Sequence, residues 1–277
     1  MPRDLADVLH YFLPELEEGR PPSELGESAA PAAKRPSRLD PAPHLTPSEA
    51  LPILGLMIGD QDVVRAALAW NLAIETTRLG GTTILLAPDV DRGSPLWPES
   101  GVGPLGSELL FCPAKDLRSL YETAAELAAC RARSAKNGGI VFVRIPPAWL
   151  NSQDEVPDIL RWVLHLTGSS PRDLDEAMAL SGRLIARHPK VEIGVTLHGV
   201  SSISEARSAY ETLACRAQSD LGLFLISYGL LVDDLNVYRA IAAQRPIGLA
   251  HPQAPATRAL MDVARLLYED ARSRVLG

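Results

Sequence analysis

The stretch 52–73, PILGLMIGDQDVVRAALAWNLA, decides the fold of this chain. A short apolar run meets a glycine and a tight loop, and the loop leads into apolar residues at helical spacing. Strand, loop and helix in this order are typical of the first unit of a phosphate-binding α/β domain. Such a loop, however, needs several glycines, a lysine and a Ser or Thr, and GDQDVVRAA keeps only the first glycine.

Short apolar runs and amphipathic helices alternate along the rest of the chain. The runs occupy 53–58, 82–88, 139–145, 191–200 and 221–231. Strands that are apolar throughout are buried on both faces, and helical connections between them indicate a parallel sheet. We therefore predict one α/β domain over 49–277, with a doubly wound, mostly parallel sheet flanked by helices.

The residues before this domain fall into two segments. Residues 1–17 predict a short amphipathic helix, and 18–48, rich in Pro, Ala and Ser, predict a flexible, disordered linker. A tethered amphipathic helix is often a recognition element for a partner protein, and the alternative is that it packs on its own domain. The candidate partner-binding residues are Leu5, Val8, Leu9, Phe12 and Leu13.

Composition and charge narrow the class of protein. The formal net charge is −7 and no dense Lys/Arg cluster occurs, which disfavours a nucleic-acid partner. The three cysteines form no CxxC pair, so no zinc site or disulfide framework is indicated. No signal peptide and no apolar run long enough to span a bilayer is evident. We expect a soluble cytoplasmic protein.

The chemistry of the loop opposes phosphate binding. Asp60 and Asp62 place negative charge where a polyphosphate would lie, at a cost of about 1–4 kcal/mol per close contact in a solvated site. Arg65 stands at the position of the phosphate-binding lysine, and Ala66 replaces the hydroxyl that would hold magnesium. Taken by itself, the loop does not predict nucleotide binding.

The order of motifs over 52–268 nevertheless resembles the MinD/ParA group of deviant P-loop ATPases, and within it the MinD and FlhG branch. Four motifs carry the resemblance: AALAWNLAIETTRLGGTTILLAPDVD, GGIVFVRIPPAW, SSPRDLDEAMALSGRLIARHPKVEIGVTLHGV and ISYGLLVDDLNVYRAIAAQRPIGLAHPQAPATRALMDVARLL. In the first motif, Asn71 matches the family's helix asparagine. The resemblance implies a P-loop NTPase-like fold for the whole domain.

The same resemblance shows where the site departs from the family. The family's signature lysine after the first glycine, Gly59, falls on Asp60, its loop lysine on Arg65 and its magnesium-binding Ser/Thr on Ala66. The family's "DAD" motif has two aspartates, of which only Asp89 remains here. The aspartate of its "DTPAG" motif falls on Arg144, and its "NR" pair, which contacts the adenine, falls on His198-Gly199. Phosphoryl transfer depends on lysines and metal to position and neutralise the phosphates. The resemblance therefore implies a pseudo-ATPase with no catalytic residue, no cofactor and no metal.

Two interpretations of the remaining arginines stay open. Arg65 and Arg144 could form a pocket that binds an anion without magnesium. Alternatively, Arg144 pairs with Asp60, Asp62 or Asp89 and the site is neutralised from within; the number of nearby carboxylates favours this. His198 is expected to be a polar residue at a strand end.

The function that these expectations favour is a non-catalytic, protein-binding adaptor or regulator in the spatial organisation or assembly of a cellular machine, such as a flagellum or other motility, polarity or division apparatus. The alternative is an active ATP-binding ATPase with a drifted loop; a DNA-associated ParA-like protein is disfavoured by the acidic charge. The final core helix accounts for LMDVARLLYEDARSRVLG, so no stable membrane anchor is expected. The family also makes a homodimer possible.

Overall fold

The protein is built on one eight-stranded sheet. The computed structural model describes residues 3–9, 50–89, 96, 98–152 and 158–276. The strand order is β3-β4-β2-β5-β1-β6-β7-β8. All neighbouring pairs are parallel except β3 with β4. The strands are β1 (Ile53–Met57), β2 (Thr82–Pro88), β3 (Gly101–Val102), β4 (Glu108–Cys112), β5 (Gly139–Ile145), β6 (Trp162–Thr167), β7 (Glu192–Val200) and β8 (Ile226–Val232).

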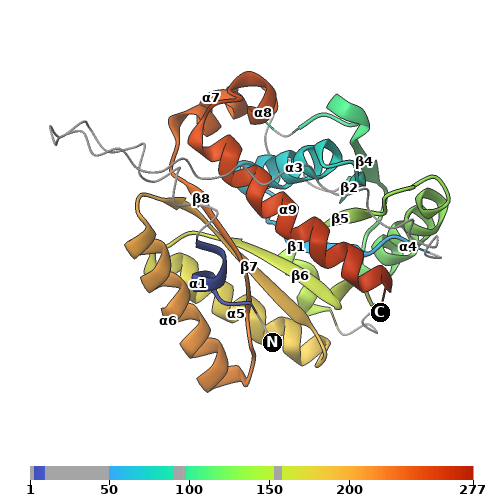
Figure 1. Cartoon of the computed structure of the whole chain (residues 1–277). Coiled ribbons are helices and arrows are strands. Elements are labelled where there is room, and N and C mark those ends of the chain that lie inside the picture. The colour runs from blue at the N-terminus through green and yellow to red at the C-terminus, as the bar shows by residue number, and fades with distance from the viewer. Residues whose placement is uncertain (1–2, 10–49, 90–95, 97, 153–157, 277) are drawn as a thin grey trace, which may run out of the picture.

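Helices cover both faces of this sheet. The helices are α1 (Leu5–Val8), α3 (Val63–Arg78), α4 (Leu117–Ala132), α5 (Pro171–Arg187), α6 (Ile203–Leu221), α7 (Leu235–Ala242), α8 (Ile247–Ala250) and α9 (Pro255–Leu276), with short 3-10 turns η2 (Pro104–Gly106), η3 (Pro147–Asn151) and η4 (Asp158–Leu160). In Figure 1, α9 crosses in front of the sheet beside α3, which it contacts. Helices α5 and α6 pack together against β6 and β7. The predicted doubly wound, mostly parallel α/β fold is confirmed.

The predicted apolar runs correspond to β1, β2, β5, β7 and β8, whereas no run was predicted for β3, β4 or β6. The run 221–231 is not a strand throughout, because α6 extends to Leu221 and Gly222 ends it in the left-handed conformation with φ of 64°. Strand β8 begins only at Ile226. Strand β6 was not predicted, since its apolar run WVLHLT is interrupted by His165. The strand is nevertheless buried along its whole length, and His165 is buried with it.

The N-terminal helix packs on its own domain. Leu5 and Val8 are each 1% exposed and Leu9 is 5% exposed, and all three belong to the hydrophobic core. The helix contacts β8 and α6, and the Arg3 carbonyl accepts a hydrogen bond from the Ser227 N–H of the edge strand at 2.8 Å. The prediction that Leu5, Val8 and Leu9 face a partner is therefore wrong for this conformation. Phe12, Leu13 and the linker at 18–48 lie outside the described residues.

The topology marks one edge of the sheet as a place for a ligand. From β1 the chain crosses through α3 to β2 on one side, whereas β6, on the other side of β1, is followed by α5 and β7. In open parallel sheets, ligands bind beyond the carboxyl ends of the strands at such a reversal of direction.

No helix in the described part of the chain has the length and hydropathy that a membrane span requires.

Candidate functional site

An open groove lies where the topology predicts a site. It is lined by the loop from Gly59 to Asp62 after β1, by the first turn of α3, and by the start of α5 after β6. Its volume is about 1130 Å³. A phosphate-binding loop of this fold class would occupy the same strand-to-helix junction. The groove is therefore the candidate nucleotide site.

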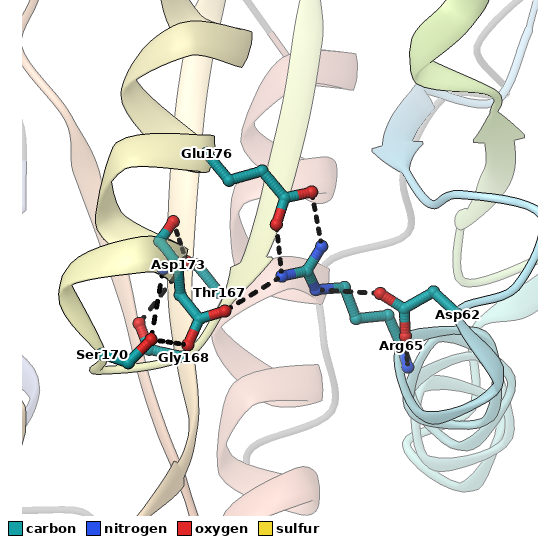
Figure 2. Close-up of polar contacts among 7 residues, drawn as sticks. All are labelled: Asp62, Arg65, Thr167, Gly168, Ser170, Asp173 and Glu176. Atoms are coloured by element: carbon teal, nitrogen blue, oxygen red, sulfur yellow. Dashed lines mark hydrogen bonds and ion pairs between the residues drawn. The ribbon is translucent and has the colours of Figure 1, made fainter.

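Arg65 is held by carboxylates on both sides of the groove (Figure 2). Its guanidinium donates two hydrogen bonds to the Glu176 carboxylate, at 3.2 and 3.3 Å. Its Nε lies 3.3 Å from an Asp62 oxygen, and an Asp173 oxygen is 4.0 Å away. A two-bonded arginine–carboxylate pair is geometrically specific and strong for its class. The Arg65 side chain thus joins α3 to α5 across the groove.

The first turn of α3 already has an anion bound to it. Asp62 is the N-cap residue, and its Oδ1 accepts a hydrogen bond from the Arg65 backbone N–H at 2.9 Å. Helix N-termini bind phosphate because their N–H groups lack partners and carry partial positive charge. Here a carboxylate of the chain itself occupies one of those donors. A phosphate would have to displace it.

The second arginine is neutralised from within. Arg144, on β5, is only 1% exposed, and its guanidinium pairs with Asp60 in a short contact. Its Nε also donates to the Ile58 carbonyl at 3.3 Å. The interpretation in which Arg144 pairs with a loop carboxylate is therefore confirmed, with Asp60 as the partner. The two arginines do not form a shared pocket, because each is engaged by a different set of carboxylates.

The charge of the groove does not fit a magnesium-bound nucleotide. Four carboxylates and two arginines line it, which leaves a formal charge of −2; they are Asp60, Asp62, Asp173, Glu176, Arg65 and Arg172. A polyphosphate carries negative charge of its own, and each close carboxylate would repel it. At the magnesium-ligand position, Ala66 offers a methyl group in a small apolar hollow. Among the described residues, no group of His, Cys, Asp and Glu side chains is arranged to hold a metal ion.

The position implied for an adenine ring is filled. His198 and Gly199 lie at the end of β7, and the space beside them has a volume of about 20 Å³. That is room for about one water molecule, whereas ligand pockets usually span about 300–1,000 Å³. Burial, followed by the charge of Arg65, lowers the pKa of His198. His198 is thus a neutral strand-end residue at ordinary pH, as expected.

Two other candidates have structural contacts. Asn71 lies in the middle of α3, where its side chain donates to the Ala67 carbonyl and accepts from the Ile247 N–H, each at 2.8 Å. It therefore ties α3 to the start of α8 and lies outside the groove lining. Asp89 follows β2, and its backbone N–H donates to the Cys112 carbonyl at 2.7 Å. Its side chain is exposed and also lies outside the groove lining.

Sequence reasoning missed the acidic side of the groove. Asp173 and Glu176 lie in the first two turns of α5, which begins after the N-cap Ser170. A Cβ at Gly168 would lie 2.4 Å from an Asp173 oxygen, so a side chain there would displace that carboxylate. The helix start was readable from Ser170-Pro171, a common N-cap and first-turn pair. Without β6, however, its place beside the loop after β1 was not visible.

Comparison with known proteins supports the fold alone. No family model and no curated protein matches the sequence. Among solved structures, MinD from Aquifex aeolicus is similar with a TM-score of 0.56 and 15% identity, over 79% of this chain and 97% of that one. The same protein in a MinC:MinD complex gives a TM-score of 0.57 and 16% identity, over 79% and 96%. A ParA family ATPase from Chlorobium tepidum TLS gives 0.50 and 15%, over 79% and 100%.

These matches establish that the chain has the fold of the MinD/ParA deviant P-loop ATPases, as the motif order predicted. The match extends over nearly the full length of each solved structure, so the domain is a complete version of that fold. At such low identity the likeness says nothing about individual site residues. The groove has to be interpreted from its own contacts.

Proposed function

We propose that this chain is a pseudo-ATPase: a cytoplasmic, non-catalytic adaptor or regulator that keeps the MinD-type scaffold for binding other proteins. The observation that carries the proposal is the network of ion pairs across the groove, in which Arg65 and Arg144 are engaged by carboxylates of the chain itself. By its resemblance to the MinD and FlhG branch, the process would be the spatial organisation or assembly of a cellular machine.

The energetics of the groove support loss of nucleotide binding. An incoming phosphate would have to break the bonds from Arg65 to Glu176 and displace Asp62 from the end of α3. It would then lie beside several carboxylates, each of which costs about 1–4 kcal/mol at a solvated contact distance. With Ala66 at the magnesium-ligand position, there is no compensating metal site.

The adaptor role rests on the scaffold and on its exposed surface. One solved structure of this fold is a complex of MinD with MinC, so the fold is compatible with a protein partner. In this chain large apolar side chains are exposed on α7 and around η2, among them Leu235, Tyr238 and Leu105. Exposed large apolar side chains are candidates for contact with a partner protein. The N-terminal helix is assigned no docking role in its packed position.

The experiment that tests the proposal compares partners with and without nucleotide. Cells are lysed with magnesium and either millimolar ATP, ADP or no nucleotide. The tagged full-length chain is then cross-linked to its partners in each lysate, and the captured proteins are quantified. We expect one set of partners whose amounts do not change with nucleotide. Partners that exchange between the ATP and ADP samples would contradict the proposal, since only a nucleotide-driven switch produces them.

The alternative, an active ATPase with a drifted loop, is favoured by the fold itself, which in MinD has been observed with bound Mg-ADP. Thermal unfolding separates the two functions. A ligand present at a hundred times its dissociation constant stabilises the folded state by about 2.7 kcal/mol. An unchanged midpoint at millimolar magnesium and ATP supports the pseudo-ATPase, and a clear rise supports the alternative.

A further inference from the structure

A second hollow, separate from the groove, lies between α3, η2 and the α7–α8 corner. Its volume is about 250 Å³. Most of its wall is apolar and comes from Ala67, Leu68, Trp70, Pro104, Val237, Ala240, Ile241 and Ile247. An apolar cavity of about 150 Å³ is enough to hold a benzene ring. This one is therefore large enough for a small organic molecule, and no side chain of the degenerate nucleotide site lines it except Asn71.

Two hydrogen-bond donors at this hollow have no partner among the described residues. Trp70 is partly buried, and its indole N–H makes no hydrogen bond to a described residue and is not a fully buried polar atom. The exposed guanidinium of Arg245, just after α7, forms no ion pair with a described carboxylate. By contrast, Asn71 is satisfied by Ala67 and Ile247. The open polar groups at the hollow are thus these two donors and the exposed carboxylate of Glu99, and the donors suit an acceptor or an anion.

The backbone around the hollow carries local strain. Only two non-glycine residues of the described chain have positive φ, Gln244 at 50° and Leu105 at 62°. Gln244 lines the hollow directly, and Leu105 follows the lining residue Pro104. Left-handed non-glycine residues cost of order 1 kcal/mol or more and gather at ligand sites. A glycine at position 244 would adopt the same φ without that cost.

We propose that this hollow binds a small molecule with an aromatic or aliphatic body and a carboxylate. The body would occupy the apolar wall against the Trp70 ring, and the carboxylate would bind the Arg245 guanidinium, which matches two-oxygen anions. Glu99 also lines the hollow and opposes the anion, so it lowers the affinity. The proposal is independent of the nucleotide groove and of the proposed adaptor role.

The test uses 3-phenylpropionate and its neutral analogue 3-phenylpropionamide, titrated into the full chain and followed by ligand-observed NMR. We expect saturable binding of the acid with a preference of about fivefold over the amide, as a charge-assisted hydrogen bond discounted for solvent exposure supplies. Arg245→Gln should abolish that preference and leave amide binding unchanged. Arg239→Gln, an exposed arginine of α7 that does not line the hollow, is the matched control and should leave both affinities unchanged.

Further variants place the ligand in the hollow. Ile241→Trp fills the space and should weaken both ligands at least tenfold, whereas Glu99→Gln should tighten the acid alone. If Ile241→Trp reduces folding, Arg245→Gln still tests the proposal, because Arg245 is exposed and its substitution leaves the core unchanged. Three outcomes would each overturn the proposal. The unmodified chain could bind the acid and the amide with equal affinity, or bind neither saturably below about 10 mM, a weak limit for fragments of this size. Arg239→Gln could also change the affinities as much as Arg245→Gln does.

Discussion

The pair between Arg144 and Asp60 makes an asymmetric prediction about stability. Arg144 has an exposed side-chain fraction of 2%, whereas that of Asp60 is 37%. Asp60→Asn keeps the guanidinium charged and buried and removes the Asp60 carboxylate that pairs with it. Arg144→Met removes the buried charge and leaves Asp60 able to hydrate. The smaller chemical change should therefore be the more destabilising one, because only Asp60→Asn leaves a charge buried.

The magnitude follows from burial. Removing one partner of a fully buried pair costs about 3–5 kcal/mol, and replacing the pair by apolar groups is often neutral. Since Asp60 is partly exposed, we discount the first value to about 2–3 kcal/mol for Asp60→Asn. Arg144→Met should lie within about 1 kcal/mol of the unmodified chain, because its neighbours in the adjoining hollow include Ile58, Leu85 and Leu109. In the Arg144→Met background, Asp60→Asn should cost less than about 0.5 kcal/mol.

The assay is urea unfolding of the four chains of this double-mutant cycle, followed by circular dichroism and tryptophan fluorescence. The exposed pair of Arg118 and Glu122 on α4 provides the control, where Glu122→Gln should change the free energy of unfolding by about 0.5 kcal/mol or less. A larger loss for Arg144→Met than for Asp60→Asn, or a coupling energy below about 0.5 kcal/mol, would refute the reasoning.

Three other predictions concern burial, the backbone and the N-terminal segment. Burial, then the charge of Arg65, lowers the pKa of His165 to about 4 from 6.5. Between pH 6.5 and 4, His165 is therefore protonated in the unfolded chain and neutral in the folded chain. The free energy of unfolding should fall by roughly 3 kcal/mol between pH 6.5 and 4, and His165→Gln should flatten that part of a pH series of urea titrations. Gln244→Gly should raise the free energy of unfolding by about 0.5–1 kcal/mol, since φ is 50° there, whereas Ala243→Gly, in a right-handed position, should lower it in the same assay. Leu5→Ala should destabilise the docked N-terminal segment by about 2 kcal/mol and speed hydrogen exchange at the Ser227 N–H, which bonds to the Arg3 carbonyl; unchanged exchange would show that the segment does not protect the edge strand.

The sequence predicted the fold because the same apolar signal recurs in five strands, β1, β2, β5, β7 and β8. Buried parallel strands must be apolar on both faces, so β1, β2, β5 and β7 were visible as continuous runs. The missed strand β6 shows the limit of that signal. His165 breaks its run, and the cost of burying that imidazole is met by a contact with the Ser181 hydroxyl at 3.2 Å, which only the tertiary structure supplies.

The candidate site was predicted in its residues but not in its geometry. The family positions of Arg65 and Arg144 could be aligned from motifs, and the excess of loop carboxylates indicated the pairing of Arg144. The partner of Arg65 could not be found in this way, since Glu176 is 111 residues away in the chain. For the N-terminal helix, an amphipathic pattern predicts a buried face but does not say what covers it. Here the cover is β8 and α6.

The central claim is that carboxylates of the chain itself hold Arg65 and Arg144 and so prevent nucleotide from binding. Equilibrium dialysis of the full chain against labelled ATP with magnesium, up to about 5 mM, measures this most directly. The account predicts no saturable binding by the unmodified chain, at low and at physiological salt. Saturable binding below about 0.1 mM that is lost in Arg65→Gln would contradict it, because Arg65 would then be bound to phosphate rather than to Glu176.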